Sequence, residues 1–133
     1  MTIIQCLDNR GGMLFNGRRQ TLDYELASII YEKYKDKLCI CSFSESFFKD
    51  LKVKTYENPL SDAPDDAVVF IENIDITEHI QKIDEIIIYR WNRHYPADRH
   101  FSFEPTEMGY KLVGKVKFST KIHEDTVKEI YRR

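Results

Sequence analysis

The sequence has no long apolar run and only three cysteines. No apolar stretch approaches the ~20 residues that a membrane-spanning helix needs. The first residues, M-T-I-I-Q-C-L-D, lack the basic start and the long apolar segment of a signal peptide. Three cysteines are too few for a disulfide scaffold and suit a reducing compartment. We therefore expect a cytoplasmic protein with no membrane partner.

A strong excess of charge is also absent, because 20 Lys and Arg residues stand against 22 Asp and Glu residues. The formal net charge of −2 does not favour attraction of the whole protein to nucleic acid or to an anionic membrane, so any basic binding surface must be local. Hydrophobic residues make up 42% of the chain, enough to bury a substantial core. The length of 133 residues predicts a single domain, 1–133.

Grouped metal ligands are absent too. Cys39 and Cys41 point to the same face of a predicted strand, but no second Cys or His pair has matching spacing. No histidine has a Cys or Ser partner visible in the sequence, so nucleophilic catalysis is not indicated. The four histidines, which form no such cluster, are His79, His94, His100 and His123. We therefore predict no metal site.

Apolar, β-branched runs alternate with amphipathic stretches, which predicts strands alternating with helices. The expected strands are Thr2–Leu7, Leu38–Ser42, Val53–Tyr56, Ala67–Ile71, Glu85–Trp91, Tyr110–Phe118 and Val127–Tyr131, although Glu124–Tyr131 could equally be a helix. The expected helices are Leu22–Tyr34, Ser44–Leu51 and Ile76–Ile83, and the expected loops are Asp8–Gln20, Glu57–Asp66 and Arg93–Phe103. This order predicts an α/β fold with three layers, a mixed and mostly parallel sheet flanked by helices.

One stretch, Asp8–Asp23, joins the first strand to the first helix and carries three of the five glycines, three arginines and a carboxylate at each end. Within it, Asn16-Gly17 is a turn signal. Asp23 can be a carboxylate at the floor of a pocket, where it binds an amidine-like ring edge and burial raises its pKa, or it can be an exposed helix N-cap. Arg18 and Arg19 can grip a phosphate or carboxylate ligand, or can pair with the carboxylates at the two ends of the stretch.

The order of these parts resembles the dihydrofolate reductase family, in which the first strand runs through an Asp-containing, Gly-rich loop into a helix with an early Asp. In that family the Asp contacts the pterin ring and supports its protonation, and Asp23 occupies the matching place. The resemblance implies a shortened fold of this type, with a pocket between Ile3–Asp8, the Met13–Arg19 loop and the Asp23 helix. It implies Asp23 as the catalytic residue and, as ligand-binding residues, Cys6, Asp8, Met13, Phe15, Arg18, Arg19 and Tyr89.

The cofactor half of that family's pattern is altered in this chain. The second strand ends in Cys41-Ser42-Phe43-Ser44 instead of Gly-Arg and a Thr, and Glu72-Asn73 replaces a Gly pair that approaches the cofactor. A Glu side chain at that place would repel a pyrophosphate. NADPH is therefore expected only if reductase activity is retained, with the matching positions being Ser42, Ser44, Glu72 and Asn73.

The chain also resembles small bacterial proteins that carry two sequence patterns, C-x-D-x-x-x-G-M-x-F-N-x-R-R-Q and Y-x-W-N-R-x-Y-P-x-D. Some of these proteins are labelled ribonuclease Z. That nuclease needs a cluster similar to H-x-H-x-D-H to hold two zinc ions, and this sequence has none. The second pattern lies in Tyr89–Phe101, where Arg, His and aromatic residues interleave as in surfaces that stack bases and contact phosphates. The alternative is that Trp91 and Phe101 lie in the core while Arg90 and Arg93 are solvated.

These patterns lead to one functional hypothesis and one alternative. The first is a protein that binds a small heterocyclic ligand, a pterin or a nucleotide; if it is an enzyme, it is an NADPH-dependent reductase in which Met13–Phe15 closes over the substrate. The alternative is a nucleic-acid or protein-interaction module that uses the Arg90–Phe101 loop together with Arg18 and Arg19. A small molecule is favoured over nucleic acid as the partner, and a homodimer could cover exposed strand edges.

Overall fold

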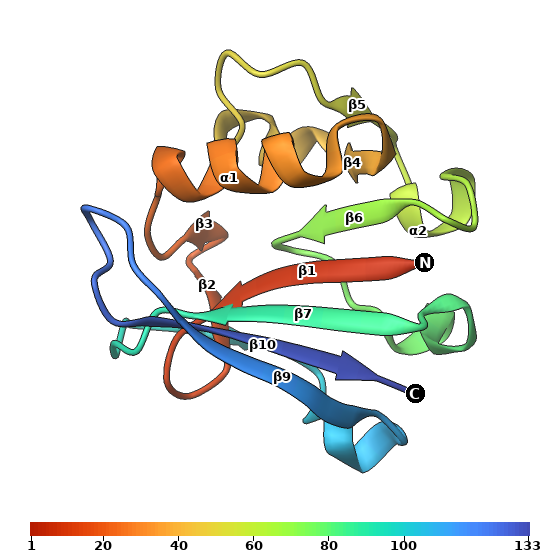
Figure 1. Ribbon diagram of the computed structural model, residues 1–133. Helices are drawn as coiled ribbons and strands as arrows, with labels where there is room; N and C mark the ends of the chain where they lie inside the picture. The colour runs from red at the N-terminus through yellow and green to blue at the C-terminus, as the bar shows by residue number, and fades with distance from the viewer.

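The structure, a computed structural model, describes residues 1–133 and contains two β-sheets and few helices (Figure 1). The strands are β1 (Thr2–Leu7), β2 (Gly12–Phe15), β3 (Arg18–Arg19), β4 (Leu38–Ile40), β5 (Lys54–Thr55), β6 (Val68–Ile71), β7 (Glu85–Arg90), β8 (Arg99–His100), β9 (Lys111–Phe118) and β10 (Thr126–Arg132). The α-helices are α1 (Tyr24–Tyr34) and the short α2 (Pro59–Asp62), and 3₁₀ turns form η1 (Lys35–Lys37), η2 (Ser42–Ser46), η3 (Thr77–Lys82) and η4 (Pro105–Met108).

The large sheet has seven strands in the order β5-β4-β6-β1-β7-β10-β9. From β5 to β7 all neighbours are parallel, whereas β10 is antiparallel to both β7 and β9. The central strands β1, β6 and β7 carry nearly continuous apolar runs because both faces of the sheet are covered. The predicted α/β fold with a mixed, mostly parallel sheet is confirmed.

The two faces of the large sheet are covered by different elements. On one face, α1 packs Leu26 and Ile30 into a cluster that includes Ile4. On the other face, α2, η3 and the segments beside them contribute Leu60 and Ile76 among other residues, and no long helix covers this side (Figure 1). The outer layers are therefore unequal, with one true helix on one side and short turns on the other.

Two predicted helices are 3₁₀ turns instead. The helix predicted for Ser44–Leu51 is replaced by η2, and the one predicted for Ile76–Ile83 is η3. The neighbours Phe47 and Phe48 are both buried, and adjacent positions of an α-helix do not face the same side, so an irregular turn buries this pair better than a helix would. The segment Glu57–Asp66, predicted as a loop, holds α2, with Pro at its first turn.

A second correction concerns Asp8–Gln20, which is a β-hairpin rather than a long loop. The strands β2 and β3 pair antiparallel and are joined at Asn16-Gly17. These two residues have φ of 50° and 70°, as a type I′ turn requires, which explains the Asn-Gly sequence. On its other edge β2 pairs with β8, so the order of the small sheet is β3-β2-β8 and the segment predicted as the loop Arg93–Phe103 also contains a strand. At the carboxyl end of the chain, β10 is a strand, so the helix alternative for Glu124–Tyr131 was wrong.

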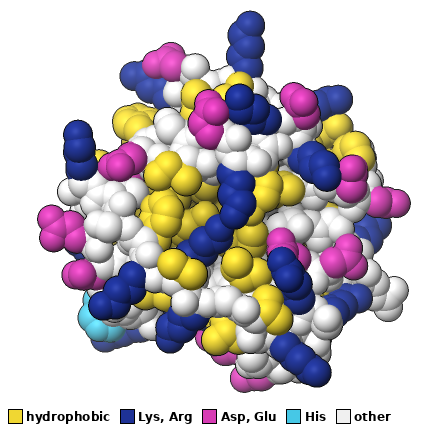
Figure 2. Space-filling view, in the orientation of Figure 1, with side chains coloured by type: hydrophobic (Ala, Val, Ile, Leu, Met, Phe, Trp, Pro, Cys, Tyr) yellow, Lys and Arg dark blue, Asp and Glu magenta, His cyan; other side chains and the backbone are white.

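One face of the molecule shows hydrophobic side chains gathered near its middle and crossed by basic side chains (Figure 2). Lys33 Nζ lies over the ring of Tyr34, and Lys128 Nζ lies over the ring of Tyr89. Burial and the neighbouring Lys33 lower the pKa of Lys128 to about 8.

No helix of the structure is both long and apolar enough to cross a bilayer.

Candidate functional site

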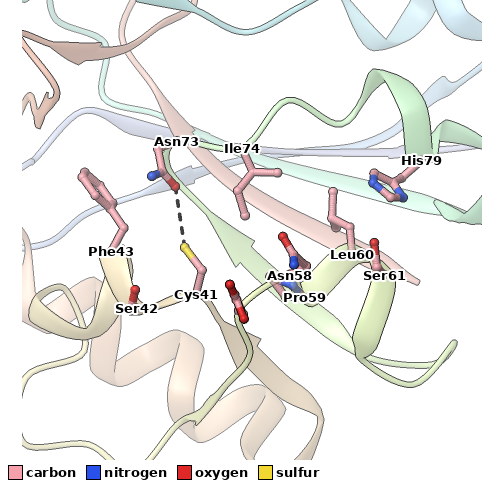
Figure 3. A pocket seen from close by; sticks show the side chains of 11 residues that line it. Cys41, Ser42, Phe43, Asn58, Pro59, Leu60, Ser61, Asn73, Ile74 and His79 are labelled. Carbon is pink, nitrogen blue, oxygen red and sulfur yellow. Dashed lines mark hydrogen bonds between the residues drawn. The ribbon is translucent and has the colours of Figure 1, made fainter.

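A cleft of about 260 Å³ opens at the carboxyl ends of β4 and β6 (Figure 3). Ligands of open α/β sheets bind at the carboxyl ends of parallel strands. One wall follows β4, another follows β6, and α2 and η3 supply the remainder. The lining residues are Cys41, Ser42, Phe43, Glu57, Asn58, Pro59, Leu60, Ser61, Asn73, Ile74 and His79.

The polar side chains of this cleft have unused hydrogen-bonding capacity. Asn58 is the N-cap of α2, but its side chain makes no capping hydrogen bond. Asn73 accepts one hydrogen bond through Oδ1, from Cys41 Sγ at 3.6 Å, and its amide NH₂ stays available (Figure 3). No Lys or Arg lines the cleft, whereas Glu57 does. The cleft is therefore suited to a ligand with several hydrogen-bonding groups and no negative charge.

The pocket predicted between the first strand and the Met13–Arg19 loop is almost closed. A residual cavity of only about 10 Å³ remains, and Cys6, Met13 and Arg19 line it together with Glu72 and others. The guanidinium of Arg19 reaches Glu72 through two hydrogen bonds, Nε to Oε1 at 2.7 Å and a terminal nitrogen to Oε2 at 2.9 Å. Both side chains are largely buried and line this cavity, which is too small for an interior ligand.

The four positions matching the cofactor side of dihydrofolate reductases divide into two groups. Ser44 Oγ donates to Glu72 Oε2 at 2.8 Å, so these two residues belong to the Arg19 ion pair. Ser42 and Asn73 line the cleft. The carboxylate of Glu72 already has its cationic partner, and the cleft offers no cation to a pyrophosphate. These residues therefore do not fit NADPH.

Asp23 is fully buried and lines none of these spaces. Its Oδ1 accepts a hydrogen bond from the backbone N–H of Leu26, so it is the N-cap of α1, but a buried one and not the exposed one that the sequence alternative described. Its Oδ2 accepts from Thr120 Oγ1 and lies 2.7 Å from His123 Nδ1. Burial by itself would raise the pKa of Asp23, but these hydrogen bonds outweigh it and lower the pKa, which corrects the predicted direction.

The remaining predicted ligand-binding residues do not line this residual cavity. Asp8 is buried and accepts hydrogen bonds from two backbone N–H groups of its own loop and from Gln20 Nε2 at 2.9 Å, so it pairs with neither Arg18 nor Arg19. Tyr89 is buried in the cluster that α1 covers. Phe15 and Arg18 line a separate, open basin beside the hairpin. The structure thus brings Cys6, Met13 and Arg19 together at the residual cavity, and Phe15 and Arg18 together with Arg19 at the basin.

Several residues of these sites were not predicted from the sequence. His123 lies 100 positions from Asp23, and no local pattern connects them. Asn58 and His79 in the cleft were also missed. For Asn58 a signal was present, because Asn followed by Pro is typical of a helix start, and it would have predicted α2. For His79 we find no signal.

Comparisons with known proteins identify the fold but no family. No family model matches the chain, and no curated protein matches it. Many chains of solved structures do match, 207 in all, among them dihydrofolate reductase from Enterococcus faecalis complexed with NADP(H) and RAB-propyl. That structure superposes with a TM-score of 0.70 at 14% identity, covering 99% of this chain and 95% of that one. The chain has a dihydrofolate-reductase-like fold.

Proposed function

We propose that the protein, which has a dihydrofolate-reductase-like fold, binds a small heterocyclic ligand in the cleft at the ends of β4 and β6. The ligand is a pterin or the base of a nucleotide. The observation that carries this proposal is the set of polar side chains there with unused hydrogen-bonding groups, above all the amide of Asn58 and the NH₂ of Asn73. Binding sites of this kind combine apolar walls with a few convergent polar groups.

The chemistry of the lining matches the edge of such a ring. An amide side chain presents a donor and an acceptor side by side, which complements the donor and acceptor pattern of a pterin or a nucleobase. Phe43 offers an aromatic wall, and Pro59, Leu60 and Ile74 offer apolar contacts for the faces of the ring. Ser42 and Ser61 add hydroxyl groups at the rim.

Hydride transfer is not part of this proposal. A reductase of this fold would need room for its substrate inside the protein, and the interior cavity that Arg19 and Glu72 line is too small for one. A dinucleotide would need donors or cations for its phosphates, and the cleft contributes Glu57 instead.

The test is binding of pterin, folate, adenosine, guanosine and NADPH, measured by thermal shift and by calorimetry. A ligand that binds only the folded state raises the melting temperature. We expect a pterin or a nucleoside to do so, and we expect Asn58→Leu and Asn73→Leu each to weaken binding of that ligand roughly fivefold, because one hydrogen bond contributes about 1 kcal/mol. The matched control is Gln81→Leu, an exposed amide outside the cleft.

Two results would contradict the proposal. One is that no compound of this panel shifts the melting temperature. The other is a shift that both Asn variants leave unchanged, which would place the ligand elsewhere. Tight NADPH binding would contradict the conclusion that the cleft lacks a pyrophosphate site.

A further inference from the structure

The small sheet β3-β2-β8 joins the two stretches of unusual composition, Asp8–Asp23 and Tyr89–Phe101, into one surface. The strand β2 pairs with β3 on one edge and with β8 on the other. Additional hydrogen bonds hold the stretches together, including Asn16 N to Asp98 Oδ2 at 3.0 Å and Gln20 Nε2 to the carbonyl of Pro96 at 3.3 Å. Residues about 80 positions apart in the sequence are therefore neighbours in the fold.

This surface concentrates arginine. The two stretches contain six of the eight arginines of the chain and none of its twelve lysines. Arg19 and Arg90 are paired with the carboxylates of Glu72 and Glu129. The other four are exposed and form no ion pair, and they are Arg10, Arg18, Arg93 and Arg99.

The carboxylates of the same stretches do little to neutralise these four charges. Asp8 and Asp23 are completely buried, and each accepts several hydrogen bonds. Asp98 is exposed, and its carboxylate accepts from the backbone of Asn16. Within the two stretches the exposed charges are therefore mostly positive, although Arg99 lies near the exposed Asp75 and helps to lower its pKa.

An open basin of about 530 Å³ lies on this surface and combines aromatic rings with a free guanidinium. Phe15 and Arg18 are directly opposite in the pairing of β2 with β3, so their side chains lie on the same face of the small sheet. Phe15 is 42% exposed, so its ring is accessible from the basin. Tyr95 and Pro96, from the second stretch, form the facing wall.

We propose that this surface binds single-stranded nucleic acid, with one base stacked in the basin against Phe15 and Tyr95 and a neighbouring phosphate held by Arg18. An exposed aromatic ring stacks on a base only where that base is not already stacked in a duplex. Arginine, unlike lysine, holds a phosphate through two parallel hydrogen bonds and also stacks on rings. Arg99 pairs with Leu14, the neighbour of Phe15, so Arg99 lies on the opposite face of the small sheet from Phe15 and Arg18. Free arginines on both faces can be reached together only by a ligand longer than one nucleotide, which favours a strand.

This proposal is independent of the cleft, since no residue lines both spaces. The test is fluorescence anisotropy with a labelled RNA of about ten nucleotides, a length typical of such sites. Binding is measured over a range of salt concentrations, with the matching duplex and free AMP as competitors. Phosphate contacts by arginine appear as a salt dependence of the affinity.

We expect the single strand to bind and the duplex and AMP to compete poorly. Phe15→Ala should weaken binding roughly tenfold through lost stacking. Arg18→Ala should weaken binding several-fold. It should also reduce by about 1 the slope of the logarithm of the affinity against the logarithm of the salt concentration. The matched controls are Tyr24→Ala, an equally exposed aromatic residue, and Lys115→Ala on β9, and both should bind as the unaltered protein does.

Three results would overturn the proposal: no binding of any single strand, equal binding of the duplex, or binding that both Phe15→Ala and Arg18→Ala leave unchanged. If Phe15→Ala does not fold, Phe15→Leu keeps the apolar volume without the aromatic face and should still lose affinity. Asn73→Leu in the cleft should leave strand binding unchanged, which separates this proposal from the proposed function.

Discussion

The Nδ1 atom of His123 lies 2.7 Å from Oδ2 of Asp23, although the two residues are 100 positions apart and both are fully buried. The ring of His123 also packs against Trp91, with ring centroids 4.2 Å apart, and its Nε2 lies 3.1 Å from Thr21 Oγ1. The backbone N–H of His123 donates to Thr120 Oγ1. Asp23 therefore both caps α1 and anchors the connection between β9 and β10.

The first prediction is that Asp23→Ala lowers the free energy of unfolding by about 3 kcal/mol or more. The substitution removes a helix cap and leaves the buried donors of His123 and Thr120 without an acceptor. Urea unfolding followed by circular dichroism measures the change. Asp125→Ala, at an exposed carboxylate in the same connection, is the control and should change stability by under about 0.5 kcal/mol. A loss below about 1 kcal/mol for Asp23→Ala would show that the cluster contributes little.

A second prediction follows from the pKa values of Asp8 and Asp23, which are both lowered. In each case burial raises the pKa, and hydrogen bonds, from Gly12, Arg10 and Gln20 for Asp8, outweigh it. Because the folded-state pKa is below the value of about 3.9 for an unfolded Asp, the unfolded state binds more protons at low pH. The stabilisation is therefore complete above about pH 4 and is lost as the pH falls through the lowered folded-state pKa. Urea midpoints between about pH 7 and pH 2 should show it, and the difference between the unaltered protein and Asp23→Asn should shrink toward the acid end.

A third prediction concerns the ion pair of Arg19 with Glu72. Arg19→Met should cost about 3 kcal/mol, because it leaves a buried carboxylate without its cation. The double variant Arg19→Met with Glu72→Gln should cost clearly less than the sum of the two single variants, since no isolated charge stays buried. Denaturant unfolding of all four proteins gives the coupling free energy. Additive losses would mean that the two side chains act independently.

A fourth prediction uses two glycines that both have ordinary backbone angles. A Cβ added to Gly12 would lie 2.6 Å from Asp8 Oδ2 and 2.7 Å from the Cβ of Ala97, which is too close for any real contact. Gly12→Ala should therefore destabilise the protein by roughly 1–3 kcal/mol through overpacking. Gly114→Ala is the matched variant, because its Cβ would meet only Ile130 at 3.4 Å or more, and its melting temperature should stay near that of the unaltered protein. Equal losses for both variants would contradict the crowding at Gly12.

Local patterns predicted the parts of the fold that short-range physics decides. The apolar runs of β1, β6 and β7 and the helical spacing of Leu26 and Ile30 identified a parallel core and its helix. The Asn16-Gly17 signal gave a turn, but not the hairpin that it closes, because the partner strand β3 has only two residues. The 3₁₀ geometry of η2 escaped prediction for a similar reason, since it depends on where Phe47 and Phe48 are buried.

The candidate site depended on contacts between residues far apart in the chain. The sequence identified Arg19 and Glu72 separately, one as a ligand-gripping residue and the other as a residue at the lost cofactor motif, and only the folded chain shows that they bind each other. That pair lines the small interior cavity, whereas the open cleft lies at Asn58 and Asn73, next to α2.

The sequence by itself determined the α/β class, the central strands and the first helix, because hydrophobic periodicity and turn chemistry act over a few residues. The tertiary structure decided which charges are paired, which are free, and in which direction the pKa of Asp23 moves. These outcomes depend on partners that packing brings together from distant parts of the chain. Arg19 and Glu72 are 53 positions apart, and Asp23 and His123 are 100 positions apart. Such long-range partners leave no periodic signal in the sequence.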